Sequence, residues 1–266
     1  MKVPSDSALP LQDHVAIVTG ASRGIGRAIA LRLARDGATV VLAARDAERL
    51  SALVADIRAN GGRAEAVAVD LREQESAPRV VAEAMAAFGR IDIVVNNAGA
   101  TKRGDFLELS DADWADGFAL KFFGAVRLTR AAWPQLRERR GTLVNISGVG
   151  GRTPGPEFTI GGSVNAAMLS FTKAMADVGV RDGVQVNAIS PGYVRTDRMQ
   201  LRLEGIMRAQ RISAEQAAQQ LVVADKIVRL GEPEDVAELV AHIVRPGGRF
   251  LHGSVIELDG GQTKTL

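Results

Sequence analysis

One short stretch of the sequence decides the fold: TGASRGIG at residues 19–26, which joins an apolar run to a segment with helical periodicity. Gly20 permits a tight turn out of a strand, Gly24 lets the main chain approach a phosphate, and Gly26 lets a helix pack closely. The first helical turn then offers free N–H groups and the positive end of its dipole to an anion. The residues expected to contact a dinucleotide here are Gly20, Ser22, Arg23, Gly24, Ile25 and Gly26.

Short apolar runs alternate with helical segments on both sides of this stretch. Strands are expected at 14–20, 38–44, 64–69, 91–97, 141–147, 184–190 and 254–260. Helices are expected at 24–36, 46–59, 73–88, 111–139, 160–181 and 234–244. This alternation predicts an α/β fold, a single Rossmann-type doubly wound parallel seven-stranded sheet with helices on both faces. The loops that leave the carboxyl ends of the strands should line one crevice.

Length and composition favour one domain, and they indicate where the protein is located and which partners it has. A flexible stretch at 1–12 should precede a domain at 13–266, in which the arginine-rich segment 195–228 forms a lid over the substrate. The net charge of +2 comes without a basic run interleaved with aromatics, so no nucleic-acid partner is expected. No signal peptide and no apolar stretch of about 18 residues is found, which predicts a cytoplasmic protein without a membrane partner.

The chain contains no cysteine and three histidines. The lack of cysteine excludes disulfides, thiolate catalysis and cysteine-based zinc sites. His14, His242 and His252 do not have the spacing of metal ligands, so no metal site is expected.

The end of the second expected strand bears on the choice of coenzyme. An acidic residue there would bind the ribose 2′-hydroxyl of NAD(H) and repel a 2′-phosphate. This chain has Ala44 followed by Arg45, and Arg23 lies in the glycine-rich loop. Two guanidinium groups can hold a phosphate, so NADP(H) is favoured over NAD(H). The alternative is that Arg45 only caps or solvates the following helix.

Further motifs, spread over residues 12–261, resemble those of the short-chain dehydrogenase/reductase family. They are Asp70-Leu71, Asn96-Asn97-Ala98-Gly99, Pro191-Gly192 with Val194 and Thr196, Arg229–Ala237, and Asp259-Gly260-Gly261. The resemblance implies adenine contacts from Asp70 and Leu71. It implies nicotinamide and pyrophosphate contacts from Asn97, Ala98, Gly99, Pro191, Gly192, Val194 and Thr196.

The resemblance also implies a catalytic set that this chain does not carry in its usual form. Members of the family use a serine, a Tyr-x-x-x-Lys pair on one helix, and an asparagine on the preceding long helix. Here Tyr193 is the single tyrosine, and Asp197 stands four residues later. No Tyr-x-x-x-Lys pair can therefore exist in any register.

A gap-free alignment on NIS (145–147) and FTKAMA (171–176) shows what replaces this set. The serine position falls on Gly148, beside Ser147, and the tyrosine position falls on Gly161. A small shift of register in the segment 148–162 would let Phe158 fill part of the tyrosine's space. The lysine position falls on Asn165 and the asparagine position on Lys121.

Three hypotheses for the function follow. In the first, the chain is an oxidoreductase acting on a carbonyl or alcohol with relocated acid/base groups, for which Lys121, Ser147 and Asn165 are the candidate catalytic residues. In the second, it binds NADP(H) as a catalytically silent subunit or redox sensor. The third, a non-redox lyase or dehalogenase, is disfavoured because such relatives tend to lose the nucleotide loop and keep the serine and tyrosine.

The remaining expectations concern the substrate and the assembly. The partner should be a small molecule, and the arginines of the lid could attract an anionic one, although a solvated helix face explains them as well. Lys102 and Arg103 follow the Asn97–Gly99 turn and could face the same cleft. The long helices at 111–139 and 160–181 resemble those through which the family assembles, which implies a homotetramer or else a dimer.

Overall fold

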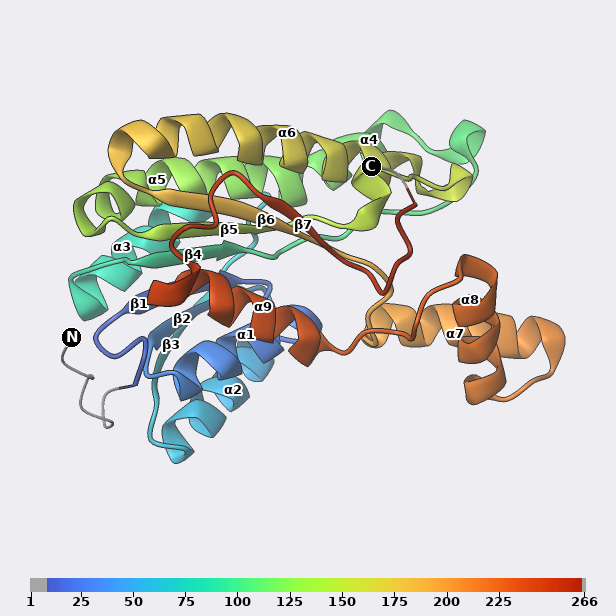
Figure 1. Cartoon of the computed structure of the whole chain (residues 1–266), viewed down its shortest axis with the longest axis horizontal. Coiled ribbons are helices and arrows are strands. Elements are labelled where there is room, and N and C mark those ends of the chain that lie inside the picture. The colour runs from blue at the N-terminus through green and yellow to red at the C-terminus, as the bar shows by residue number, and fades with distance from the viewer. Residues whose placement is uncertain (1–8, 265–266) are drawn as a thin grey trace.

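A computed structural model describes residues 9–264, which fold around one parallel sheet (Figure 1). Its seven strands follow the order β3-β2-β1-β4-β5-β6-β7, and every pair of neighbours is parallel. The strands are Val15–Thr19 (β1), Thr39–Ala44 (β2), Arg63–Ala68 (β3), Ile93–Asn96 (β4), Thr142–Ile146 (β5), Gln185–Pro191 (β6) and Val255–Leu258 (β7). The direction of winding reverses between β1 and β4, so the predicted doubly wound sheet is confirmed.

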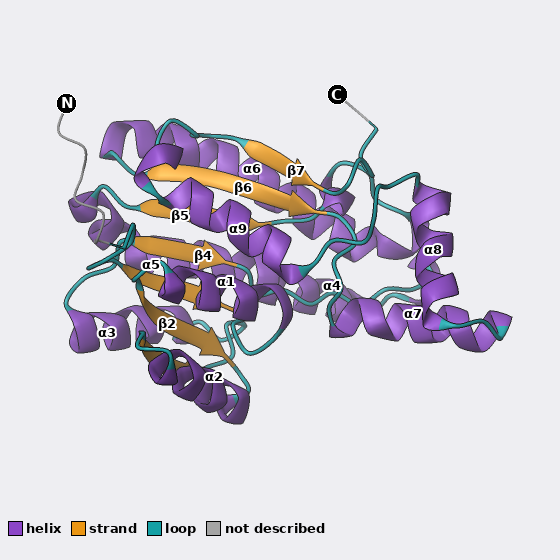
Figure 2. Cartoon of the chain, turned by 60° about the horizontal axis from the view of Figure 1, so that its bottom comes forward, coloured by secondary structure: helices purple, strands orange, loops and turns teal. Residues whose placement is uncertain are grey.

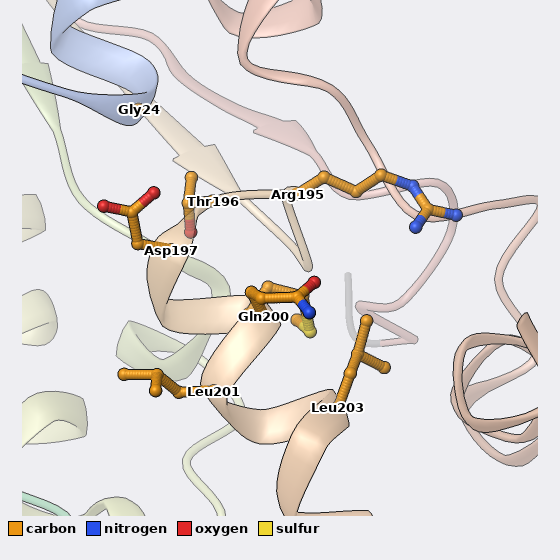
Figure 3. Close-up of a pocket in the computed structure, with 8 residues that line it drawn as sticks. Gly24, Arg195, Thr196, Asp197, Gln200, Leu201 and Leu203 are labelled. Atoms are coloured by element: carbon orange, nitrogen blue, oxygen red, sulfur yellow. The ribbon is translucent and has the colours of Figure 1, made fainter. Parts of the chain in front are cut away.

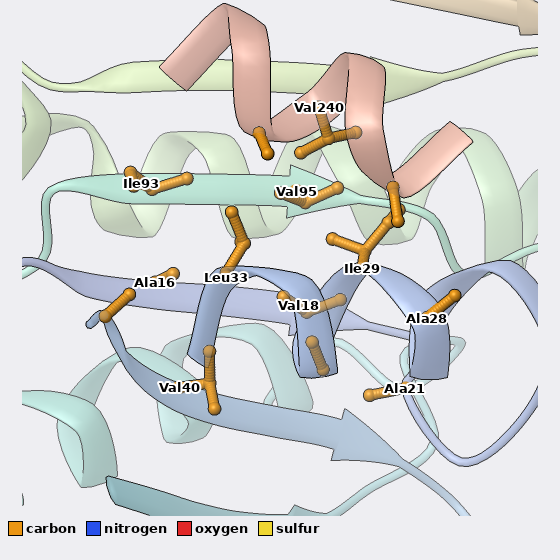
Figure 4. Packing of buried hydrophobic residues seen from close by; sticks show 14 of the residues in the cluster. Ala16, Val18, Ala21, Ala28, Ile29, Leu33, Val40, Ile93, Val95 and Val240 are labelled. Atoms are coloured by element: carbon orange, nitrogen blue, oxygen red, sulfur yellow. The ribbon is translucent and has the colours of Figure 1, made fainter. Parts of the chain in front are cut away.

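Helices cover both faces of this sheet (Figure 2). Their bounds are Gly24–Arg35 (α1), Ala47–Ala59 (α2), Ser76–Phe88 (α3), Asp111–Phe118 (α4), Gly124–Arg139 (α5), Thr159–Asp182 (α6), Asp197–Gln210 (α7), Ala214–Asp225 (α8) and Pro233–Val244 (α9). One apolar cluster joins α1, α2 and α9 to the sheet, and a second joins α3 and α5 to the opposite face. Figure 4 shows Ile29 and Leu33 of α1 between the strands and Val240 of α9.

The expected single helix at 111–139 is interrupted. Its start is as predicted, because Ser110 and Asp113 form a reciprocal capping box at the beginning of α4. A π-helical turn at Ala119–Phe123 then separates α4 from α5. A π-helical turn inserts an extra residue into the helix, which changes the direction of the following side chains. Periodicity alone did not reveal this turn, and it contains Lys121.

Two segments lie outside the sheet and its covering helices. Leu11, within the stretch expected to be flexible, is buried, and its N–H donates to the Asp36 carbonyl at 2.9 Å. Residues 1–8 of that stretch lie outside the described residues. In the lid segment 195–228, α7 and α8 pack against each other around an apolar cluster of their own. Figure 1 shows these two helices beyond the strand ends at which the predicted crevice opens.

Candidate active site

The loop after β1 has the backbone that its glycines were expected to provide. Gly20 and Gly24 have φ values of 65° and 52°, a region that favours glycine. A Cβ on Gly26 would lie 2.3 Å from the Gly20 carbonyl oxygen, so α1 could not approach β1 with any larger residue. The residue after the neighbouring strand β4 fixes the start of this loop, because Asn97 Nδ2 donates to the Thr19 carbonyl at 2.8 Å.

The N-terminus of α1 is open to an anion. Arg23 is the N-cap residue, and no side chain of the described residues accepts a hydrogen bond from the first turn at the cap. Thr196, at the start of α7, faces this end of the helix, and its Cγ2 would lie 3.2 Å from a Cβ on Gly24. A cavity of about 520 Å³ opens beside these residues (Figure 3). Its walls are formed by Gly24, Arg195, Thr196, Asp197, Met199, Gln200, Leu201 and Leu203.

A second cavity of about 410 Å³ lies on the outer side of the glycine-rich loop. Arg23 and Arg49 line it, and both guanidinium groups approach the Asp197 carboxylate, at 3.2 and 3.7 Å. Arg49 was not predicted, because its position one turn into α2 shows no sequence signal. Arg45 is exposed and lies 3.7 Å from the Asp70 carboxylate. The region therefore presents several cations where the second strand ends.

Lys121 lies at the centre of a buried polar cluster. Its Nζ donates to Asn165 Oδ1 at 2.6 Å and to the Ser147 carbonyl oxygen at 2.8 Å. The Ser147 hydroxyl in turn donates to the Asn165 carbonyl at 3.0 Å. Burial lowers the pKa of Lys121 from 10.5 to about 7, and the positive charge of Arg198 contributes to the decrease. The structure thus brings together all three residues that the sequence nominated.

The Lys121 cluster, meaning Lys121, Ser147 and Asn165, adjoins the turn after β4. A Cβ on Gly99 would lie 2.9 Å from Lys121 Cδ, so the lysine side chain packs directly against this glycine. The turn itself is fixed to the glycine-rich loop, because the Asn97 and Ala98 N–H groups both donate to the Thr19 hydroxyl at 2.9 Å. Lys121 and the glycine-rich loop that leads into α1 are therefore both in contact with the same turn.

The Phe158 ring fills the space beside Gly161. A Cβ on Gly161 would lie 2.1 Å from two carbons of that ring, so a side chain at 161 and the ring cannot coexist as placed. The Arg103 guanidinium also stacks on the Phe158 ring, 4.6 Å from its centre. Lys102, in contrast, pairs with Asp113 at 2.9 Å. Only Arg103 of these two basic residues extends toward the Phe158 ring.

Comparison with known proteins decides the family. A family profile described as short chain dehydrogenase matches residues 14–205, and an uncharacterized oxidoreductase of Mycobacterium tuberculosis is 39% identical over 95% of this chain and 93% of its own. The chain belongs to the short-chain dehydrogenase/reductase family. Matched relatives are named as an oxidoreductase or as reductases, which agrees with the predicted class of activity.

Solved structures of short-chain dehydrogenases/reductases superpose closely on this chain. The L-sorbose reductase of Gluconobacter frateurii, complexed with NADPH and L-sorbose, has a TM-score of 0.92 and 31% identity over 97% of this chain and all of that chain. An NADPH-bound short chain oxidoreductase of Pseudomonas aeruginosa PAO1, described as containing an atypical catalytic center, has a TM-score of 0.89 and 30% identity. That alignment covers 96% of this chain and 99% of the other.

The other family motifs occupy the same edge of the sheet. Asp70 Oδ1 accepts a hydrogen bond from the Arg72 N–H at 3.0 Å, and Leu71 is buried beside Gly124. Gly192 is packed against Asp259, where a Cβ would lie 2.8 Å from the aspartate Cβ. Val194 forms an isolated bridge with Gly231, so the C-terminal signature supports the segment that leads into α7.

Two further features are absent from the described residues. Residues 9–264 contain no cluster of three or more histidine, cysteine or acidic side chains arranged to hold a metal ion. Within the same residues, no helix combines the length and the apolar composition that a membrane span requires.

Proposed function

We propose that this chain is an NADP(H)-dependent oxidoreductase that acts on a carbonyl or alcohol group with a non-standard acid/base set. The observation that carries the proposal is the hydrogen-bonded Lys121 Nζ, buried beside the Asn97–Gly99 turn. A general acid or base works best when its pKa lies near the working pH. A pKa of about 7 lets Lys121 both hold and release a proton at neutral pH.

The residues around the glycine-rich loop fit an NADP(H) molecule. Side chains larger than glycine at Gly20 and Gly26 would clash with the loop and with Asn97, so the tight turn depends on these glycines, and α1 begins there without a side-chain cap. The preference for NADP(H) over NAD(H) rests on Arg23, Arg45 and Arg49, which can balance a 2′-phosphate. When bound, the coenzyme would supply or accept the hydride.

The three residues of the Lys121 cluster have separate roles in this proposal. Lys121 exchanges the proton with the substrate oxygen and stabilises negative charge on it. Asn165 accepts one N–H of the ammonium group and thereby aims the remaining one. Ser147 holds Asn165 through its hydroxyl and Lys121 through its carbonyl, so it is a positioning residue.

Turnover with a panel of ketones, aldehydes and imines tests this function through the consumption of NADPH. Reduction should slow as the pH rises through 7, because Lys121 then loses the proton that it donates. Lys121→Met should abolish most of the rate, by about 10²-fold or more. Lys173→Met is the matched control, because that exposed lysine of α6 hydrogen-bonds only the Gly253 carbonyl. Equal rates in both variants would remove Lys121 from the mechanism.

The alternative function, a catalytically silent NADP(H)-binding subunit or redox sensor, is favoured by one observation. The Phe158 ring fills the space beside Gly161, and phenylalanine cannot donate a proton. Calorimetric binding of NADPH without turnover on the whole panel would establish this alternative. Absence of heat with either coenzyme, oxidised or reduced, would contradict both functions.

We further infer a cytoplasmic homotetramer, with a dimer as the alternative. Phe123, at the end of the π-helical turn, and Val180 of α6 expose 46% and 72% of their area, and apolar surface on these long helices is suited to assembly. Light scattering on the purified protein measures the mass. A monomer at micromolar concentration would contradict the inference.

A further inference from the structure

Three arginines gather where the lid segment meets the Asn97–Gly99 turn. Arg198 Nη2 donates to the Gly99 carbonyl at 2.8 Å. The Arg202 guanidinium lies 4.5 Å from the centre of the Tyr193 ring, and that of Arg103 lies 4.6 Å from the centre of the Phe158 ring. We call these three residues the arginine cluster. An arginine stacked on a ring keeps the N–H groups at its edge available for other partners.

No close ion pair within the described residues balances the charge of the arginine cluster, and Glu157 acts on Arg103 only from a longer distance. Among residues 9–264, none of the three guanidinium groups has a carboxylate oxygen within 4.0 Å, whereas nearby Arg23 and Arg195 pair with Asp197 and Glu232. Partial removal from water lowers the pKa of Arg103, and the charge of Arg202 lowers it further. The pKa of Arg198 is lowered in the same way by burial and by Arg23 and Arg103. An anion between these groups would relieve their mutual repulsion.

The arrangement separates this cluster from the expected phosphates of the coenzyme. Arg23 pairs with Asp197 in the first turn of α7, Arg198 reaches the Gly99 carbonyl, and Arg202 follows about one helical turn after Arg198. Arg23 belongs to the glycine-rich loop, where the phosphates are expected. Arg103 and Arg202 lie at the other end, on aromatic rings, and Phe158 of that end packs against Gly161.

We propose that the substrate carries an anionic group, a carboxylate or a phosphate, which Arg103 and Arg202 hold while its carbonyl group faces Lys121. This inference rests on the proposed oxidoreductase function and adds the substrate class. A guanidinium group matches the geometry of either oxyanion with two parallel hydrogen bonds. Binding at the arginine cluster would also fix the distance between the anionic group and the reacting carbon.

Calorimetry on the NADP⁺-saturated protein tests the inference through binding, since NADP⁺ cannot reduce a ketone, and a constant NADPH absorbance checks that no alcohol group of a probe is oxidised. The carboxylate probe is acetoacetate, paired with its neutral methyl ester, and the phosphate probe is dihydroxyacetone phosphate, paired with dihydroxyacetone. At least one anion should bind ten or more times more tightly than its neutral partner. The stronger of the two shows which oxyanion fits better.

Variants then locate the site. Arg103→Gln and Arg202→Gln should each reduce the preference for the anion about tenfold or more, with an unchanged Kd for NADP⁺. Arg208→Gln removes the same charge from α7 and should change nothing, because that exposed guanidinium hydrogen-bonds only the Glu204 carbonyl. The unchanged NADP⁺ affinity also shows that each variant is folded.

Three results would overturn the inference: no heat from either anion, equal affinity for the neutral partners, or a preference that survives in both arginine variants. Its failure is distinct from failure of the oxidoreductase function. Turnover of neutral carbonyl compounds alone would refute the anionic substrate and leave the reaction intact. Anion binding at these arginines without any NADPH consumption would refute the oxidoreductase function and leave the anion site intact.

Discussion

Lys121 and Asn165 occupy the two positions at which the family resemblance leads one to expect an asparagine and a lysine. Their side chains meet at 2.6 Å, and in this chain the cation lies on the π-helical turn while the amide lies on α6. The sequence identified both residues through alignment. Their contact could not be predicted, because it depends on the direction that the π-helical turn gives to Lys121.

The depressed pKa of Lys121 has a consequence for stability. The unfolded chain binds this proton more strongly than the folded chain, so the charged lysine destabilises the fold below pH 7, and the penalty diminishes as the pH rises from 7 to 10.5. Lys121→Met removes the titrating group. Its stability relative to the parent should be greater at pH 6 than at pH 9 by about 3 kcal/mol. Urea unfolding at both pH values measures this, and a pH-independent difference would contradict the depressed pKa.

Arg45 bears on the choice between NADP(H) and NAD(H). Arg45→Ala removes an exposed cation beside Asp70, and the preference for NADP(H) over NAD(H) should fall by about tenfold because a charge-assisted contact is lost. Dissociation constants for both coenzymes give the ratio. Arg58→Ala, which removes an exposed arginine paired with Glu65, should leave that ratio unchanged. A constant ratio in Arg45→Ala would mean that this guanidinium only solvates α2.

Among the secondary-structure elements, α1 depends most visibly on one residue. Gly26→Ala would place a Cβ 2.3 Å from the Gly20 carbonyl oxygen, so α1 must move and the fold should lose about 1–3 kcal/mol. The displaced helix end should also bind NADPH more weakly. Thermal unfolding and calorimetry measure the two effects.

Gly205→Ala is the matched change within α7. Nothing lies within 4 Å of its Cβ, so alanine should raise helix stability by about 0.5–1 kcal/mol. An equal change of stability in Gly26→Ala and Gly205→Ala would contradict the close packing of α1.

Most elements could be predicted because hydrophobic period and cap residues are local properties. Each strand of the sheet was expected within two residues of its bounds, and the helix that begins at Asp111 was expected to start there. The π-helical turn was missed because an extra residue inside a helix leaves apolar spacing nearly intact. Arg49 was missed for a related reason, since only folding brings α2 close to Asp197 at the start of α7.

Across the whole molecule, the lid segment is the part with an apolar cluster of its own. Because α7 and α8 are joined to the body by few buried side chains, they should open without unfolding the sheet. Hydrogen exchange of their amides should be at least about 100-fold faster than in β1, β4 and β5, and NADPH should slow it. Equal protection of the lid and the central strands, with or without NADPH, would contradict an independently opening lid.

The global arrangement was predictable to the level of sheet type, because strand–helix alternation allows few right-handed topologies. The position of the lid relative to the Asn97–Gly99 turn could not be predicted. The contact between Arg198 and the Gly99 carbonyl joins residues that are 99 positions apart in the sequence. Contacts over such distances depend on tertiary packing. The arginine cluster therefore emerges only from the folded chain.

The presence of a single tyrosine in this chain has a practical consequence. Tyr193 stacks against the Arg202 guanidinium and lies in the connection between β6 and α7. Biosynthetic incorporation of 3-fluorotyrosine would give one ¹⁹F resonance, without any mutation. Its chemical shift and line width would report on ligand arrival and on exchange between open and closed states in a spectrum that needs no assignment.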